Sequence, residues 1–375
     1  MTRTITLSFI AFCITLAAGV AQIPPRKFKR IQKFIDKATD KKLTGVVVYI
    51  RDSHGDKWTG TSGYSNLENK ISLHPDHVFA LASIGKMYNA VAVMKLVDEG
   101  RIQLDDKITR YLPGEITAQL PSPENVSVRH LLGHTSGFVN YEFDPKLVDS
   151  YMSGQLKLDT MPHGSILKKY VFGKQSLNAP GTEFHYSSTN YLLLAMVVDQ
   201  VVPEGHAEYL RALLKQQGLL RTTYRQTPAA NNVSYYGDPN MDGNPDNLTD
   251  KTFETTNWFM GDDGVYAPIA EAALFIERVM DGHVLSAASL ASMKHGNTVK
   301  RDTGLGLITD QSFPYGLLYG HGGRGIGVTT DLYYFPRQKI TIAIFCNNGL
   351  RAASPDFRKV YIKMRSSIVR KIFLF

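Results

Sequence analysis

Segments with the pattern of β-strands lie near both ends of this 375-residue chain, with a long stretch between them that lacks such runs. Near the N-terminus, the β-branched run Gly45–Ile50 and the run Lys57–Tyr64 flank a turn, which predicts a hairpin. Near the C-terminus, Gly327–Phe335 and Ile340–Phe345 predict two strands, and Phe313–Tyr319 predicts a weaker one. We therefore expect one sheet that is built from both ends of the chain.

The middle of the chain predicts helices and loops. From Arg101 to about Trp258 it contains many Pro, Gly and Asn residues, and amphipathic helices are predicted at Pro25–Lys37 and Pro355–Lys371. The predicted fold class is α/β of the α+β type, with a mixed, mainly antiparallel sheet, flanking helices and an inserted helical region. We expect a single domain over residues 22–375, with a sheet subdomain at about 22–100 and 265–375 and a helical subdomain at about 101–264. A cleft is expected where the two subdomains meet.

The first residues have the pattern of a secretory signal. Arg3 precedes an apolar run, and Gly19-Val20-Ala21 places small residues before the expected cleavage point. We expect residues 1–21 to be removed, which predicts a periplasmic or secreted protein with no transmembrane segment in the mature chain. Cys346 would then be the only remaining cysteine, so no intramolecular disulfide is expected.

The formal net charge is +8, and much of the excess lies in Arg26–Lys42 and Arg351–Lys371. We interpret these segments as solvated faces of packed terminal helices. Contact with an anionic envelope remains the alternative, because basic amphipathic segments are attracted to such surfaces. Nucleic acid is not an expected partner, since no basic motif interleaved with aromatic residues accompanies them.

Ser83 and Lys86 lie at the start of an apolar helical segment that reads FALASIGKMYNAVAVM. Residues three apart face the same side of a helix, so the two side chains should meet. A serine hydroxyl becomes a nucleophile when a nearby base takes its proton, and a lysine kept neutral by burial can assist. The unpaired N–H groups of a helix start also suit an oxyanion. This pair is sufficient for acyl transfer, although Ser-x-x-Lys alone is a common pattern.

Two further motifs accompany the pair: Tyr186-Ser187-Ser188, and His321-Gly322-Gly323 before a β-branched strand. Together they resemble the serine β-lactamase and penicillin-binding protein superfamily, most closely its class C branch, which includes DD-carboxypeptidases, D-aminopeptidases and esterases. The resemblance covers nearly the whole mature chain. Supporting segments are Leu96–Asp106, Arg129–Gly137 and His321–Gly327.

The resemblance implies a β-lactamase/transpeptidase-like fold and a role for each matching residue. Ser83 would attack the substrate carbonyl, and Lys86 would hold it and help to deprotonate it. Tyr186 would be the general base, and because a tyrosine with an ordinary pKa needs a neighbouring cation to act at neutral pH, Lys86 would supply that charge. His321 stands where many relatives have the lysine of Lys-Thr-Gly. No cofactor and no metal are implied.

The resemblance also implies how the substrate would be held. The backbone N–H groups of Ser83 and Arg324 would form the oxyanion hole. Gly322 and Gly323 would let the strand edge approach the substrate. Ser188 is a departure, because relatives usually have asparagine at this position, and a hydroxyl reaches less far than an amide. This difference affects the expected recognition of penicillins and peptides more than the serine chemistry.

Three other patterns have weaker functional interpretations. His130 and His134 have the spacing of zinc ligands, but no glutamate lies within the motif, so a scaffolding role is favoured. The stretch 238–249 places oxygen-bearing residues around Gly243 as calcium loops do, yet its last position is Thr249, and its residue types also simply form turns. The turn Gly261–Gly264 is a candidate for the wall of the cleft.

These observations predict an exported serine hydrolase that cleaves an amide or ester through a covalent acyl-enzyme on Ser83. The expected activity is that of a D-alanyl-D-alanine carboxypeptidase, a D-aminopeptidase or an esterase, so the expected partner is a small peptide, ester or β-lactam substrate. A class C-type β-lactamase is the alternative within the same chemistry. A catalytically silent module that binds muropeptides is the alternative of another class.

Overall fold

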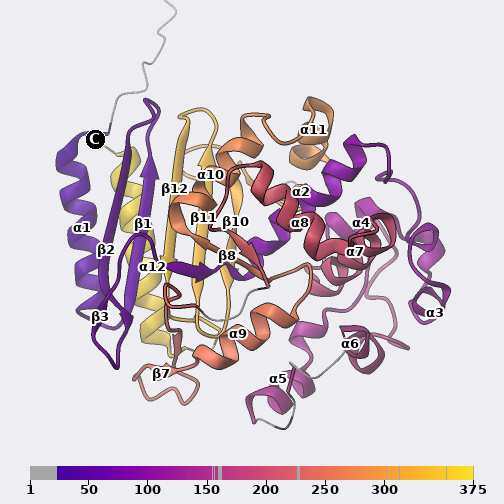
Figure 1. Cartoon of the computed structure of the whole chain (residues 1–375), viewed down its shortest axis with the longest axis horizontal. Coiled ribbons are helices and arrows are strands. Elements are labelled where there is room, and N and C mark those ends of the chain that lie inside the picture. Colours follow the sequence, from indigo (N-terminus) through magenta and orange to yellow (C-terminus); the bar gives the residue numbers. More distant parts are fainter. Residues whose placement is uncertain are drawn as a thin grey trace, which may run out of the picture.

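The computed structural model describes residues 23–374, except 154, 156, 159–162, 226–228, 301, 312 and 352. The predicted signal segment 1–21 therefore lies outside the described residues. Within the described part, no helix has the length and apolar character that crossing a membrane requires. Figure 1 shows a sheet at one end of the molecule and a group of helices at the other.

The main sheet has seven strands in the order β3-β2-β1-β12-β11-β10-β9. Its neighbouring strands all pair antiparallel, and the N-terminal β1 pairs with the C-terminal β12 from Val46 opposite Cys346 to Arg51 opposite Thr341. The predicted union of both chain ends in one mainly antiparallel sheet is thus confirmed. The strands are β1 (Gly45–Arg51), β2 (Lys57–Asn66), β3 (Ile71–Ser72), β9 (Ile308–Asp310), β10 (Leu318–Arg324), β11 (Thr329–Phe335) and β12 (Ile340–Cys346).

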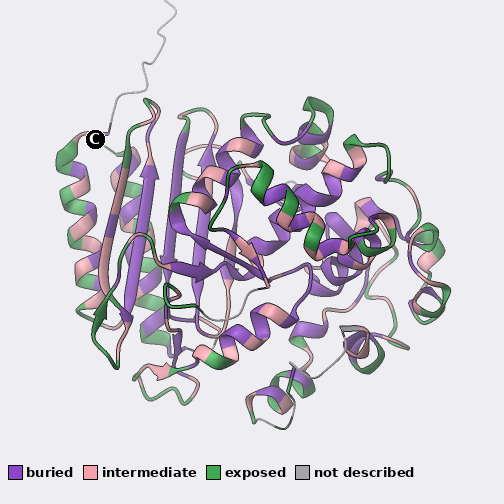
Figure 2. Cartoon of the chain, viewed as in Figure 1, coloured by how far each residue is buried: buried purple, intermediate pink, exposed green. Residues whose placement is uncertain are grey.

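Two hydrophobic cores lie on opposite faces of this sheet. The outer core packs α1 (Pro25–Thr39) and α12 (Pro355–Phe373) against alternate residues of β1 and β12, such as Val48 and Ile344. The inner core packs α2 (Gly85–Asp98) and α10 (Ile269–Met280) against the other face and continues into the helical region. Both sides of β1 and β12 are therefore buried, which explains their unbroken runs of apolar residues. Figure 2 shows these strands in the colour of buried residues.

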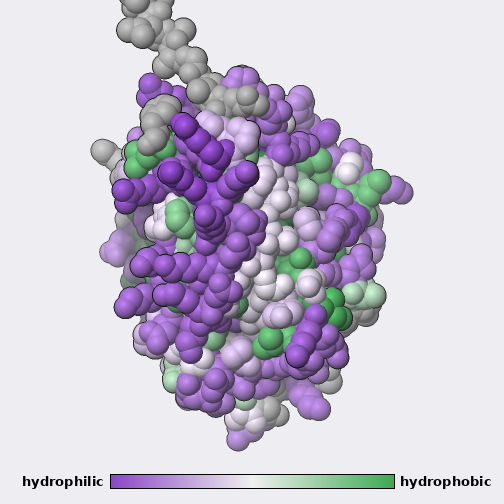
Figure 3. Space-filling model, turned by 90° about the vertical axis from the view of Figure 1, so that its left-hand side faces the viewer, coloured by the Kyte–Doolittle hydropathy of each residue, from purple (hydrophilic) through white to green (hydrophobic). Residues whose placement is uncertain are grey.

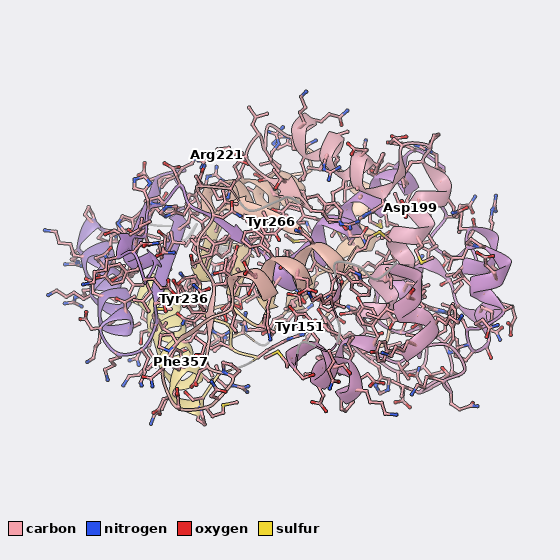
Figure 4. All side chains as sticks on the ribbon, turned by 60° about the horizontal axis from the view of Figure 1, so that its bottom comes forward. Tyr151, Asp199, Arg221, Tyr236, Tyr266 and Phe357 are labelled. Atoms are coloured by element: carbon pink, nitrogen blue, oxygen red, sulfur yellow. The ribbon has the colours of Figure 1, made fainter. Side chains whose placement is uncertain are left out.

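The helical region occupies the other end of the molecule, as predicted. In Figure 4, Phe357 of α12 lies on the sheet side of the molecule, and Asp199 lies on the opposite, helical side. The remaining helices are α3 (Gly114–Thr117), α4 (Val128–Leu132), α5 (Pro145–Met152), α6 (His163–Tyr170), α7 (Ser188–Val201), α8 (Gly205–Gln216), α9 (Thr249–Trp258) and α11 (Ala287–His295). Short 3-10 helices are η1 (Ala82–Ile84), η2 (Ile108–Arg110), η3 (Pro123–Asn125) and η4 (Tyr141–Phe143).

Two small sheets join this region to the main sheet. One has the order β4-β8-β5, formed by Val78–Ala80, Val265–Pro268 and Thr223–Tyr224. The other pairs β6 (Tyr236–Gly237) with β7 (Asp246–Asn247). Because β4 immediately precedes η1, its pairing with β8 holds the start of the Ser83 segment beside the Gly261–Gly264 turn.

The strand predicted at Phe313–Tyr319 was wrong in its position. The strand in this part of the chain is β10, Leu318–Arg324, so His321 lies within a strand, and the β-branched strand predicted after it is present as β11. Three glycines conceal this strand from propensity reasoning, because glycine is disfavoured in strands. The fold requires small residues here: a Cβ atom on Gly320 would come 2.0 Å from Leu332 O, and one on Gly323 would come 2.3 Å from Leu81 O.

This packing predicts that Gly320→Ala destabilises the protein by about 1–3 kcal/mol, because the neighbouring strand has to move. Gly114→Ala is the matched control, since a Cβ atom there has nothing within 4 Å and the position is helical. We expect the control to be neutral or to stabilise by up to about 1 kcal/mol. Urea unfolding followed by circular dichroism measures both, and equal stability of the two variants would contradict the register of β10.

Candidate active site

Ser83 is the middle residue of η1, which leads directly into α2. The backbone before it is held in an unusual conformation, since Ala82 has φ +49°. The hydroxyl of Thr330 on β11 donates a 2.8 Å hydrogen bond to Leu81 O, which ties this turn to the main sheet. Ser83 is partly exposed, whereas its neighbours on both sides are buried. The turn therefore presents a single hydroxyl to solvent from an otherwise buried segment.

Lys86 lies behind this hydroxyl and is completely buried. Its Nζ donates to Ser83 Oγ at 3.2 Å and forms an ion pair with Asp262 Oδ2 at 3.3 Å. It also lies 3.4 Å from the carbonyl oxygen of Asp262. The predicted contact between Ser83 and Lys86 is present in the structure, and the lysine has a carboxylate partner that the serine-lysine motif did not reveal.

Tyr186 lies on the other side of Lys86, just before α7. Lys86 Nζ is 5.0 Å from the centre of the tyrosine ring, a distance at which a cation interacts with an aromatic face. The ring is supported by His134, whose centroid is 4.4 Å away and whose Nδ1 accepts a hydrogen bond from Ser187 N. Segments more than a hundred residues apart therefore meet around one ammonium group.

Tyr186 and two buried carboxylates determine the charge state of Lys86. Burial alone lowers the pKa of a lysine, but Tyr186, Asp262 and Glu142 oppose this effect, and the net shift of the Lys86 pKa is upward. The lysine is therefore a cation at neutral pH. This outcome differs from the sequence-based option of a lysine kept neutral by desolvation, because the fold brings buried negative charge to it.

Glu142, on η4, extends this charged cluster. Burial raises the pKa of Glu142, but Arg351 and Lys86 more than offset that effect and hold its pKa below the usual value. Its carboxylate forms an ion pair with Arg351 and accepts a 2.7 Å hydrogen bond from Ser188 Oγ. Burial, against the opposing effect of Lys86, raises the pKa of Asp262 to about 6. Burial and the charge of Asp262 raise the pKa of Asp263 to about 8.

Ser188 lies within this cluster and does not line the cleft. It is the first residue of α7, is fully buried, and its hydroxyl is hydrogen-bonded to Glu142. The asparagine expected from the resemblance would have offered an amide to the substrate, whereas this hydroxyl donates a hydrogen bond to Glu142. Ser188 thus contacts the buried charged cluster and not the cleft.

His321 of β10 faces the cleft near Tyr186, with 6.5 Å between the ring centroids. Its Nδ1 lies 2.8 Å from Gly322 O, and because a carbonyl oxygen only accepts, Nδ1 carries the proton. Burial, followed by the charge of Lys86, lowers the pKa of His321 to about 4. The imidazole is neutral at pH 7 with Nε2 as an acceptor, so it does not replace the positive charge of the lysine that many relatives have here.

Gly323 brings the end of β10 onto the turn that contains Ser83. A Cβ atom on Gly323 would lie 2.3 Å from Leu81 O and 2.9 Å from Ala82 Cβ, so only glycine allows this approach. The next residue, Arg324, ends β10, and its guanidinium turns away to donate to Thr330 O at 2.7 Å and to Asp331 Oδ1 at 2.6 Å. The main chain of Arg324 is thus held close to the Ser83 turn, while the oxyanion role of its N–H remains a prediction.

Ser83 opens into a cleft of about 630 Å³ between the sheet and the helical region. Phe143, Phe184 and Tyr333 supply aromatic surface, and Tyr186, His321 and Gly322 lie around the serine. Lys300, Arg324, Arg351 and Arg365 also line the cleft, where Asp331 pairs with Arg324 and Arg365, and Glu142 pairs with Arg351. A cleft of this size accommodates a small amide or ester, and the positive charge that remains after this pairing suits a substrate that bears a carboxylate.

The other two sequence candidates have structural explanations. His130 Nδ1 accepts from Ser127 N, and His134 Nδ1 accepts from Ser187 N, so each ring serves a local backbone group. In the stretch 238–249, Asp238 accepts from Gly243 N and Asp242 accepts from Asn244 N, as turn residues do. Among the described residues, no three His, Cys, Asp or Glu side chains are grouped as metal ligands.

Sequence reasoning missed three members of this site: Glu142, Asp262 as the partner of Lys86, and Arg351. The Gly261–Gly264 turn was a candidate for the cleft wall, and its paired aspartates between glycines were the available signal for Asp262. Glu142 and Arg351 lie in segments without a recognisable motif, and they are 209 residues apart in the chain. Only the fold brings them together.

The cluster predicts a specific dependence on pH. Since the pKa of Asp262 is about 6, its charge is present above that pH and is lost below it, so hydrolysis should fall as pH drops through about 6. Asp262→Asn should lower kcat/KM by about 10- to 100-fold, because Lys86 loses its anchor, and should abolish this acidic limb. Stopped-flow or steady-state hydrolysis of an activated ester measures both effects.

Asp263→Asn is the matched control, because the pKa of Asp263 is about 8 and its neutral form is already present over the acidic limb. This variant should retain the limb. An acidic limb that persists in Asp262→Asn and disappears in Asp263→Asn would assign the titration to Asp263 and contradict this interpretation.

Comparison with known proteins identifies the family. The family model described as "Beta-lactamase" matches residues 30–363. Penicillin-binding protein 4 of Amycolatopsis lactamdurans is 26% identical over 321 residues, which cover 79% of each chain. Protein flp of Staphylococcus aureus is 28% identical over 166 residues, or 44% of this chain, and the match spans only 32% of that protein's length.

A solved structure agrees with the fold. The D-stereospecific amidohydrolase from Streptomyces sp. superimposes with a TM-score of 0.76 and 23% sequence identity, covering 89% of this chain and 97% of that one. Because the family model spans most of the chain, including Ser83, Lys86, Tyr186 and His321, the chain belongs to the beta-lactamase family.

Proposed function

We propose that the protein cleaves the amide or ester bond of a small D-amino-acid derivative through an acyl-enzyme on Ser83. The observation that carries this proposal is the geometry of one hydroxyl and one cation: Ser83 Oγ is partly exposed in the cleft and lies 3.2 Å from the buried Nζ of Lys86. The centre of the Tyr186 ring lies 5.0 Å from the same ammonium group. A nucleophile, a cation and a candidate base are thus within reach of one substrate carbonyl.

The proposed reaction proceeds in two halves. Tyr186 acts as a phenolate beside the ammonium of Lys86 and takes the proton of Ser83 Oγ as this oxygen attacks the carbonyl carbon. Lys86 remains an ammonium that stabilises the developing negative charge. The N–H groups of Ser83 and Arg324 receive the oxyanion. Tyr186 then delivers its proton to the leaving amine or alcohol. In the second half, water attacks the acyl-enzyme while Tyr186 takes a proton from the water. Tyr186 then returns this proton to Ser83 Oγ as the acid is released.

The substrate class rests on the cleft and on the relatives. The Streptomyces protein of the same fold is a D-stereospecific amidohydrolase, and another relative is a penicillin-binding protein. Around its aromatic surface the cleft has a lysine and three arginines, and the arginines are paired with only two carboxylates, Asp331 and Glu142. The positive charge that remains suits an acyl donor or leaving group with a carboxylate. We also propose export through residues 1–21, which N-terminal sequencing of the secreted protein would test by finding Gln22 as the first residue.

The nucleophile predicts a covalent adduct. Brief exposure to an activated ester, and separately to a penicillin, should add one acyl group to the protein, as measured by intact-mass spectrometry. Ser83→Ala should form no adduct and should lose hydrolysis by at least about 1,000-fold. Ser53→Ala is a suitable control, because this serine lies in the hairpin turn away from the cleft.

The penicillin experiment separates the alternatives. A penicillin adduct that persists favours a peptidase, whereas rapid release with turnover identifies a β-lactamase. The absence of both an adduct and any Ser83-dependent turnover with either reagent would contradict the proposed hydrolase and favour a silent binding module.

The proposed substrate class predicts stereochemical selectivity. The anilides of D-alanine and L-alanine form a matched pair, and we expect kcat/KM for the D form to be greater by at least about 10-fold. Selectivity should vanish together with activity in Ser83→Ala. Equal rates for the two enantiomers in the native protein would favour a general esterase and would leave the nucleophile assignment intact.

A further inference from the structure

The positive charge of the protein is concentrated in two helices that the fold places side by side. α1 and α12 each contain six Lys or Arg residues and one Asp, so each contributes +5 and the pair contributes +10. The whole chain has a net charge of +8, so everything outside these helices sums to −2. The excess charge is therefore a property of one surface of the molecule.

Packing makes this surface continuous. Lys27 Nζ, at the start of α1, donates to Ile372 O at the end of α12, and Lys42, just after α1, lies over the ring of Phe357 at the start of α12. The helices are therefore antiparallel neighbours along their length. Both bury their apolar sides against the outer face of the sheet, which turns most of their basic residues to solvent. Figure 3 shows this side of the molecule as predominantly hydrophilic.

A groove of about 470 Å³ lies between the two helices. Its floor contains Phe34, Ala38, Val360 and Met364, and its rim contains five lysines and a single acid. The lysines are Lys37, Lys41, Lys42, Lys359 and Lys363, and the acid is Asp356. An apolar floor with a cationic rim matches a ligand that has an anionic head and a hydrocarbon body, which is the chemistry of an anionic phospholipid.

We propose that the face formed by α1 and α12 binds the surface of an anionic membrane, with the groove receiving a phospholipid. The apolar floor favours a lipid over a nucleic acid, because a phosphodiester backbone would contact the lysines and leave the apolar floor exposed to water. The Ser83 turn packs on the inner side of the sheet, opposite to α1 and the outer core. Docking through the outer face therefore leaves Ser83 accessible. This inference is independent of the proposed hydrolase activity.

The test is vesicle flotation with the full chain. Vesicles of phosphatidylcholine with about a quarter phosphatidylglycerol are compared with pure phosphatidylcholine, at about 50 mM and about 500 mM NaCl. We expect binding to the anionic vesicles at low salt, with loss at high salt. Binding to both vesicle types that is independent of salt would instead report hydrophobic insertion and would overturn the proposal.

Two matched variants locate the binding surface. The groove variant changes Lys37, Lys41, Lys359 and Lys363 to Gln, and the control changes Lys168, Lys169, Lys174 and Lys215 to Gln. All eight side chains are exposed, and both variants lose the same charge. The groove variant should bind anionic vesicles at least about 10-fold more weakly, while the control should bind like the native protein. Equal weakening in both would show attraction by net charge alone and overturn the site.

Two further measurements make the result decisive. Thermal unfolding of both variants should match that of the native protein, because exposed lysines contribute little to stability, so lost binding cannot be attributed to misfolding. A duplex DNA with matched phosphate concentration is the competing ligand. Displacement of the protein from vesicles by this duplex, with tighter binding to DNA, would identify a nucleic-acid face and overturn the lipid assignment.

Discussion

The buried ammonium group of Lys86 is the interaction on which the site depends. A charge with no exposure to water costs several kcal/mol unless partners surround it, so this residue requires others to be in place. Asp262 supplies the ion pair, Ser83 an acceptor, and Tyr186 an aromatic ring whose centre lies 5.0 Å from Nζ. These partners come from the turn before β8, the start of α7 and the 3-10 turn before α2. The charge thus links the sheet region to the helical region at the cleft.

The two buried carboxylates near Lys86 are stabilised by further partners. Glu142 and Asp262 are both buried, and two close carboxylates raise each other's pKa unless cations compensate. Arg351, from the C-terminal part of the chain, forms an ion pair with Glu142, and the Ser188 hydroxyl donates a hydrogen bond to the same carboxylate. A serine at the usual asparagine position therefore fits its surroundings, because its hydroxyl donates a hydrogen bond to Glu142. The neutral His321 follows the same logic, since the adjacent ammonium disfavours a second cation.

Local patterns failed where tertiary contacts override propensity. β10 contains three glycines and was displaced in the sequence interpretation, yet close approach to Leu332 and Leu81 requires glycine at two of these positions. A strand residue is normally chosen for its side chain, but here the absence of a side chain permits contact between backbones. The same approach brings Arg324 to the Ser83 turn, so the feature that concealed the strand also assembles the site.

The sequence by itself determined most of the elements and the candidate reacting groups. Hydrophobic runs identified β1, β2, β11 and β12, helical spacing identified α1 and α12, and the residues of the serine-lysine, tyrosine and histidine motifs identified the family. These features are local, since each depends on neighbours within a few residues. Only the tertiary structure decided the charge state of Lys86, the burial of Ser188, the pairing of Glu142 with Arg351, and the union of two basic helices in one face. Each of these depends on distance and burial between distant segments, which no local pattern encodes.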